Sequence, residues 1–102
     1  MEINITLTAK HFRNATRFSD PMNCPLSVAL KEQFKTDRVI VGGNCAIINN
    51  QYFTTDWSAY KNGKSINDMI FDAKKKRGVG EHSVKLNIEI HNALIAGLTN
   101  LN

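Results

Sequence analysis

Two cysteines and three histidines are the residues of this sequence best suited to nucleophilic or metal chemistry. Cys24 stands just before Pro25, at a predicted helix start, where free N–H groups favour a thiolate. No histidine stands at a spacing that pairs with it, and a small buried cysteine is the ordinary alternative. Cys45 lies in an apolar run and is expected in the core. We therefore predict no enzymatic activity and expect Cys24→Ser to leave function intact.

The same residues do not form a recognisable metal-binding pattern. His11, His82 and His91 combine with neither cysteine in a C-x-x-C, H-x-x-x-H or other compact ligand spacing. A Walker loop and a dinucleotide fingerprint are also missing, and the adjacent Gly42 and Gly43 are typical of a turn or bulge. We expect neither a metal nor a cofactor.

Basic residues favour a site for phosphate. The chain has 13 Lys and Arg against nine Asp and Glu, a formal net charge of +4. Unpaired N–H groups at a helix start bind anions, and a basic loop precedes the helix that begins near Asn23. The predicted anion- or nucleotide-binding residues are His11, Arg13, Arg17, Asn23, Cys24, Lys74, Lys75, Lys76 and Arg77. The alternative is that Asn23 satisfies the helix start and that residues 74–77 are a solvated helix end.

Aromatic and apolar residues suggest a second surface, for a protein partner. Trp57 and Tyr60 could stack on a base or pack at a rim, but aromatic side chains also dominate interface energetics. The tail after the last predicted strand is apolar and is expected to dock on the core or on a second copy. The predicted interface residues are Trp57, Tyr60, Leu94, Ile95 and Leu98. We expect a homo-oligomer.

Hydrophobic patterning gives the elements that position these residues. Seven elements are predicted in this order: a strand from Ile3 to Ala9, a helix from Pro25 to Phe34, strands at Arg38–Val41, Cys45–Ile48 and Gln51–Thr54, a helix from Ile66 to Ala73, and a strand from Val84 to Ile90. The result is a single α+β domain over residues 1–102 with order β-α-β-β-β-α-β. It has two helices, a small antiparallel or mixed sheet of four to five strands, and an apolar C-terminal tail.

Short sequence patterns predict the helix caps and the turn between these elements. Asn23 or Cys24 caps the first helix, Asn49-Asn50 suits a two-residue hairpin turn, and Ser65 with Asp68 resembles a capping box. The segment from Lys10 to Asn23 is expected as a mostly irregular loop with a short turn around His11 to Ala15. A single helical turn is expected from Asp56 to Tyr60.

The sequence predicts a cytosolic protein. No apolar run approaches the roughly 18 to 20 residues of a membrane span, and the N-terminus lacks the pattern of a secretion signal. Both cysteines are expected as reduced thiols.

Two short motifs are familiar. The Cys24-Pro25 start of a helix that ends in Ala29-Leu30, and the segment from Phe71 to Lys74, stand in the same order as in a group of short phage proteins. The chain resembles this group of functionally unassigned bacteriophage and prophage proteins, in which a Cys-Pro-hydrophobic-Ala-Leu helix and a Phe-Asp-Ala-Gly-Lys-like segment recur. It departs from them in the basic run 74–77 and in the tail. The resemblance implies an α+β fold and a phage origin, and it carries over no catalytic residue.

Three functions are compatible with these features. The leading hypothesis is a phage-encoded, non-enzymatic accessory or anti-defence protein that sequesters a phosphate-bearing nucleotide signal in the host cytosol. The first alternative is an inhibitor that binds a host defence protein. The second is a nucleic-acid-binding protein that uses the cluster from Lys74 to Arg77.

Overall fold

The computed structural model describes residues 2–58, 60 and 65–87. Its strands are β1 (Glu2–Leu7), β2 (Val39–Val41), β3 (Cys45–Ile48), β4 (Gln51–Asp56) and β5 (His82–Asn87), and its helices are α1 (Ala9–Arg13), α2 (Pro25–Phe34) and α3 (Ile66–Lys74). The predicted α+β class and the order of the seven predicted elements are confirmed, and α1 is an additional helix.

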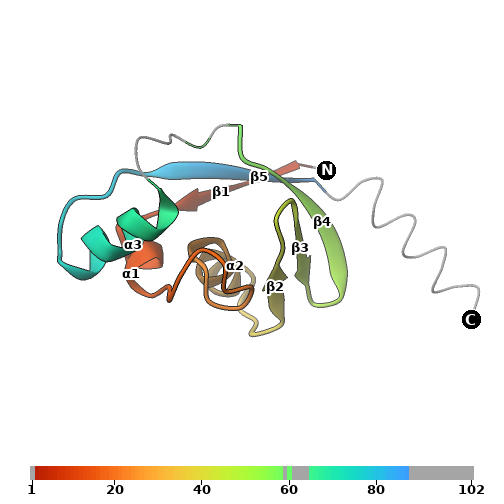
Figure 1. The fold of residues 1–102 in the computed structure, drawn as a ribbon. Coiled ribbons are helices and arrows are strands. Elements are labelled where there is room, and N and C mark those ends of the chain that lie inside the picture. Colours follow the sequence, from red (N-terminus) through yellow and green to blue (C-terminus); the bar gives the residue numbers. More distant parts are fainter. Residues whose placement is uncertain (1, 59, 61–64, 88–102) are drawn as a thin grey trace, which may run out of the picture.

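The five strands form one antiparallel sheet in the order β1-β5-β4-β3-β2. The sheet curves around the helices, with α2 in its concavity and α1 and α3 side by side at one end (Figure 1). Alternation of burial along the strands sets which face meets the helices. In β5, for example, Val84 and Leu86 are buried while Lys85 between them is partly exposed.

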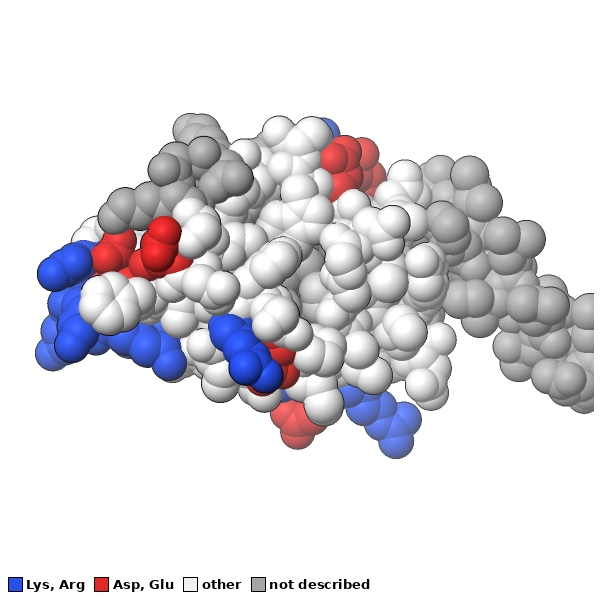
Figure 2. All heavy atoms as spheres, in the orientation of Figure 1, with Lys and Arg blue, Asp and Glu red and all other residues white. Residues whose placement is uncertain are grey.

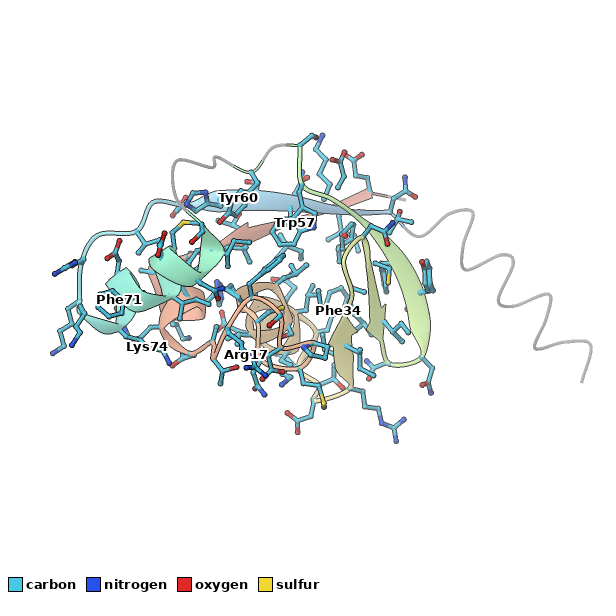
Figure 3. All side chains as sticks on the ribbon, viewed as in Figure 1. Arg17, Phe34, Trp57, Tyr60, Phe71 and Lys74 are labelled. Carbon is cyan, nitrogen blue, oxygen red and sulfur yellow. The ribbon has the colours of Figure 1, made fainter. Side chains whose placement is uncertain are left out.

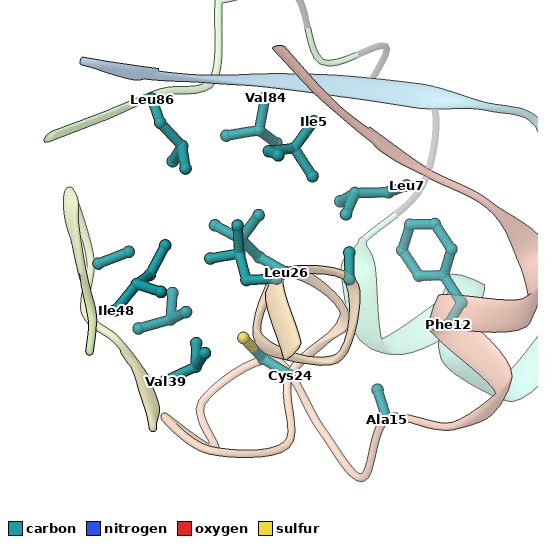
Figure 4. Packing of buried hydrophobic residues seen from close by; sticks show 14 of the residues in the cluster. Ile5, Leu7, Phe12, Ala15, Cys24, Leu26, Val39, Ile48, Val84 and Leu86 are labelled. Carbon is teal, nitrogen blue, oxygen red and sulfur yellow. The ribbon is translucent and has the colours of Figure 1, made fainter. Parts of the chain in front are cut away.

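The core lies between α2 and the concave face of the sheet. Leu26 on α2 is fully buried and is surrounded by side chains from both halves of the sheet, among them Val84 and Ile48 (Figure 4). Phe12 extends this cluster toward α1. Each such side chain stabilises the fold by about 1.5–3 kcal/mol through its burial.

Local capping sets the helix ends. The Cys24 sulfur accepts a hydrogen bond from the Ser27 N–H at 3.4 Å, with Pro25 in the first turn, and Lys35 ends α2 in the left-handed conformation at φ 52°. The Ser65 hydroxyl oxygen accepts from the Asp68 N–H at 3.1 Å and begins α3. The predicted start of each helix is therefore confirmed.

The predicted hairpin is also confirmed. Asn49 and Asn50 connect β3 to β4 with φ values of 51° and 67°. Both central residues of a type I′ turn need positive φ, and asparagine tolerates that conformation better than most residues.

Three predictions need correction or lie outside the described residues. The supposed loop after β1 begins with α1, because His11 and Phe12 are buried and the His11 Nδ1 accepts a hydrogen bond from the Thr8 N–H at 3.0 Å. The segment expected as a helical turn, from Asp56 to Tyr60, is a turn in which the Tyr60 N–H donates to the Trp57 carbonyl at 2.9 Å and the Ser58 N–H donates to the Asp56 side chain at 2.8 Å. The last strand begins at residue 82, and its predicted end and the tail with Leu94, Ile95 and Leu98 lie outside the described residues.

None of the helices in the described part of the chain is long and apolar enough to cross a membrane.

Candidate functional site

The predicted anion site at the start of α2 does not have the expected geometry. Cys24 is only 3% exposed, and Leu26 and Ser27 are fully buried. The Ser27 N–H donates to the Cys24 sulfur, and the Ser27 hydroxyl donates to the Cys24 carbonyl at 2.8 Å. Cys24 rather than Asn23 therefore caps the helix. The expectation of outward-facing N–H groups is wrong here, because the first residues of this helix are buried in the core.

The three basic residues predicted around that helix start do not gather there. His11 is buried, with its Nδ1 bonded to the Thr8 N–H and its Nε2 3.5 Å from the Glu32 carboxylate. Arg13 reaches α3, where its Nε donates to the Ala73 carbonyl at 3.3 Å. Arg17 is exposed on the loop before α2. The predicted residues are thus dispersed, and only Arg13 joins the second predicted cluster.

That second cluster lies at the C-terminal end of α3. Its members come from α3, from the residues after it and from α1, and they gather at one end of the molecule (Figure 2). We call this cluster the basic end: Arg13, Lys74, Lys75, Lys76 and Arg77. Phe71 lies beside it, 55% exposed, with the Lys75 ammonium 5.7 Å from the centre of its ring.

A groove lined by aromatic residues lies at the other end of α3. It has a volume of about 540 Å³, and we call it the aromatic groove: Phe18, Trp57, Tyr60, Ser65, Ile66 and Asn67. The Phe18 and Trp57 rings meet edge to face with centroids 6.4 Å apart, and Trp57 meets Tyr60 in the same way at 5.4 Å. Figure 3 shows Trp57 and Tyr60 next to one another near the start of α3, and Phe71 and Lys74 toward its end.

Buried rings support the groove from below. Tyr60 stacks on His82 with centroids 4.6 Å apart, and His82 meets Phe12 edge to face at 5.8 Å. The Tyr60 hydroxyl donates to the Met69 sulfur at 3.5 Å. Burial raises the pKa of Tyr60 to about 12, so its side chain is neutral at neutral pH. The groove thus has a floor of packed rings.

The loop that carries Phe18 is organised around one carboxylate. We call residues 14–23 the Phe18 loop. Asp20 accepts hydrogen bonds from the Thr16 hydroxyl at 2.8 Å and from the N–H groups of Met22 and Asn23 at 3.0 and 3.1 Å. These bonds, that of Thr16 first, hold the pKa of Asp20 below its usual value. The segment expected as an irregular loop is therefore held together by hydrogen bonds between its own residues.

Hydrogen bonds also fasten the Phe18 loop to its neighbours. The Phe18 N–H donates to the Asn67 side-chain oxygen at 2.8 Å, and the Val41 N–H donates to the Pro21 carbonyl at 2.8 Å. Phe18 itself is 47% exposed. On its far side lies a second groove of about 220 Å³, lined by Phe18, Ser19, Pro21, Val41, Gly42 and Gly43. Phe18 therefore forms a ridge between two grooves, and the hydrogen bond of its N–H to Asn67 fixes the position of this ridge.

The aromatic groove offers mainly aromatic and apolar contact area. Its described lining offers π faces, apolar contact area and two small polar side chains, of which Ser65 already caps α3. Within residues 2–58, 60 and 65–87, no group of His, Cys, Asp and Glu could hold a metal ion. Sequence reasoning singled out Trp57 and Tyr60 but missed Phe18, whose only signal was an aromatic residue in a polar loop.

Comparisons with protein-family models, with curated proteins and with solved structures find no match to this chain. The resemblance to short phage proteins stays a prediction that rests on its two motifs.

Proposed function

We propose that this chain is a non-enzymatic binding protein that docks onto a partner protein through the aromatic groove and the Phe18 ridge. The observation that carries this proposal is the position of Phe18. Its ring is half-exposed between two adjacent grooves while its backbone is hydrogen-bonded to α3. Among the three functions considered from the sequence, this geometry best supports the protein-binding one.

The size and shape of the surface around Phe18 suit a macromolecular partner. A stable protein interface buries about 800 Å² on each partner, with a few aromatic residues at its centre that contribute most of the affinity. The two grooves together extend from the start of α3 to the Gly42-Gly43 turn after β2. This is an extended surface with one protruding ring, whereas a small ligand would need only one of the grooves.

The Phe18 loop is ordered before a partner binds, which also favours protein binding. A loop that must be ordered on binding loses affinity through the entropy of its immobilised side chains and backbone. The Asp20 hydrogen bonds and the Asn67 tether hold the Phe18 loop in place before any partner arrives. Phe18 can therefore contribute its contact area without that loss.

The chemistry of the partner follows from the lining. The groove residues that the structure describes are uncharged, so the inserted group is an apolar side chain such as Leu, Met or Phe. Arg17 is exposed immediately beside Phe18, which favours a carboxylate of the partner next to that apolar anchor. Given the resemblance to phage proteins, we propose that the partner is a host defence protein in the cytosol.

Nucleotide sequestration ranks below protein binding. The residues expected to hold the phosphate at the start of α2 lie apart, and that helix start is buried. A base could still stack on Trp57 or Phe18 in the aromatic groove. The experiment for the proposed function therefore includes nucleotides as competing ligands.

The test compares two variants that each shorten an exposed apolar side chain. Phe18→Ala removes the protruding ring, and Ile40→Ala changes a residue on β2 that is 49% exposed and does not line either groove. Host proteins captured by the wild-type chain should be retained by Ile40→Ala and lost by Phe18→Ala. Truncation of a central aromatic residue costs at least about 2 kcal/mol, or roughly 30-fold in Kd, which titration calorimetry with the captured protein measures.

Two outcomes would contradict the proposal. Equal affinity of Phe18→Ala and wild type would remove the ridge from the interface. A nucleotide that raises the melting temperature of the wild type but not of Phe18→Ala would assign the groove to a small ligand. Phe18 and Ile40 are 47% and 49% exposed, so the two truncations should destabilise the protein by similar amounts. Thermal unfolding of both variants shows whether each is folded at the assay temperature, which separates loss of binding from loss of fold.

A further inference from the structure

The C-terminal end of α3 has more positive charge than the helix itself requires. The Ala73 carbonyl accepts from the Lys76 N–H at 3.1 Å and from the Arg13 side chain at 3.3 Å. The Asp72 carbonyl accepts from the N–H groups of Lys75 and Arg77 at 3.1 and 2.9 Å. Backbone N–H groups and one arginine thus already satisfy the Asp72 and Ala73 carbonyls near this helix end.

The lysine ammonium groups of the basic end are therefore available to a ligand. Arg77 lies 3.4 Å from the Asp72 carboxylate, whereas no ion pair within the described residues involves Lys74, Lys75 or Lys76. All three lysines are exposed. Cations grouped in this way attract the phosphates of a nucleic acid and release its counterions on binding.

Phe71 adds an aromatic platform at the edge of these charges. Its ring is 55% exposed on the outer side of α3, one helical turn before Lys75, whose ammonium lies over it. Exposed aromatic rings beside cations are the combination that single-stranded nucleic acids use, with a base on the ring and phosphates on the lysines. The bases of a duplex are already stacked on one another, so they cannot stack on Phe71.

We propose that the basic end, together with Phe71, is a binding surface for single-stranded nucleic acid. One base stacks on Phe71 and displaces the Lys75 ammonium from its ring, while the neighbouring phosphates contact Lys74, Lys75 and Lys76. This surface is separate from the aromatic groove and does not depend on the protein-binding function proposed above.

The first test is the salt dependence of binding. Fluorescence anisotropy with a labelled 15-nucleotide single strand, in DNA and RNA forms, gives the affinity between 50 and 200 mM salt. Three to four phosphate contacts predict a slope of log K against log salt of about −2 to −3, which is a loss of about 20- to 50-fold over this range. A flat salt dependence, or no binding at 50 mM salt, would overturn the proposal.

Matched lysine variants locate the surface. Lys74→Gln/Lys76→Gln removes two charges of the basic end, and Lys35→Gln/Arg38→Gln removes two elsewhere. Lys35 and Lys76 both have left-handed backbones, at φ 52° and 59°, so the two double variants carry a similar local strain. The first variant should flatten the salt slope by about 1.4, while the second should keep the slope of the wild type. Equal effects of the two variants would overturn the assignment to the basic end.

Phe71→Ala distinguishes a single strand from other polyanions. It should weaken strand binding at least about five-fold, the lower limit for one base on an aromatic ring, and leave the salt slope unchanged. The same measurements with a 15-base-pair duplex and with free ATP should give much weaker binding. Equal affinity for the duplex, equal affinity for ATP, or no loss with Phe71→Ala would refute the single-strand assignment.

Discussion

The two histidines that are buried in the described chain make opposite predictions for stability. His11 and His82 are 7% and 8% exposed. The His11 ring has a partner at each nitrogen, the Thr8 N–H at 3.0 Å and the Glu32 carboxylate at 3.5 Å. The Nδ1 of His82 is buried and has no hydrogen-bond partner among residues 2–58, 60 and 65–87. An unsatisfied buried polar atom costs about 1–3 kcal/mol, so replacement by an apolar ring should help at one site and harm at the other.

His82→Phe should stabilise the protein. The new ring keeps the contacts of His82 with Tyr60 and Phe12, whose centroids lie 4.6 and 5.8 Å away, and removes the unsatisfied nitrogen. Crowding from the larger ring offsets part of the gain. We expect the free energy of unfolding to rise by about 1 kcal/mol, which for a domain of this size raises the melting temperature by about 4–8 °C.

His11→Phe should destabilise the protein. It removes the acceptor of the Thr8 N–H at the start of α1 and the contact with Glu32. We expect a loss of about 1–3 kcal/mol, measured like the gain at His82 by urea unfolding at pH 7.5 with circular dichroism and with the fluorescence of Trp57, the single tryptophan. Changes of the same sign in both variants would refute the reasoning, because ring packing would then outweigh polar satisfaction.

Three further predictions concern capping and titration. Ser65→Ala should lower the free energy of unfolding by about 1 kcal/mol in urea titrations, because the N-cap of α3 is lost, and Ser65→Asn should restore most of it. Hydrogen bonds lower the pKa of Asp20, so its stabilisation is present above its usual pKa and is lost as the pH falls through the folded value. Asp20→Asn should therefore lose less stability than the wild type between pH 5 and 3. Burial raises the pKa of Tyr60 to about 12 from its usual 10.0, so its contribution is present below pH 10 and is lost as the pH rises through 12. Tyr60→Phe should lose less stability than the wild type over that range, which urea unfolding in alkaline buffers measures.

Elements specified by neighbouring residues could be predicted from the sequence. The bounds of α2 were predicted correctly because a proline in the first turn and a periodic apolar face both depend on adjacent residues. The Asn49-Asn50 turn and the Ser65 cap are local in the same sense, since each needs only a backbone conformation or a hydrogen bond three residues away. The helix bounds, the turn and the cap are therefore determined by residues close in sequence and not by distant parts of the chain.

Features that depend on distant residues could not be predicted. α1 has five residues, too few for a periodic pattern, and the burial of Phe12 against the core stabilises it. Phe18 is held by Asn67, which is 49 positions away in the sequence, and Arg13 meets the end of α3 across 60 positions. The start of α2 was predicted to bind an anion because the first N–H groups of a helix have no partner within it. The burial of Cys24 in the core depends on residues distant in sequence, so it appears only in the folded structure.

The two proposed surfaces are joined by α3, which sets their separation. Its first residues line the aromatic groove, its last residues belong to the basic end, and nine residues span about 13.5 Å at 1.5 Å per residue. Met69, Ile70 and Ala73 pack against the core, so this spacing is rigid. A circular interface of about 800 Å² has a radius of about 16 Å. A protein centred on Phe18 would therefore reach toward the basic end, and the bound protein and a bound strand should compete for that part of the surface.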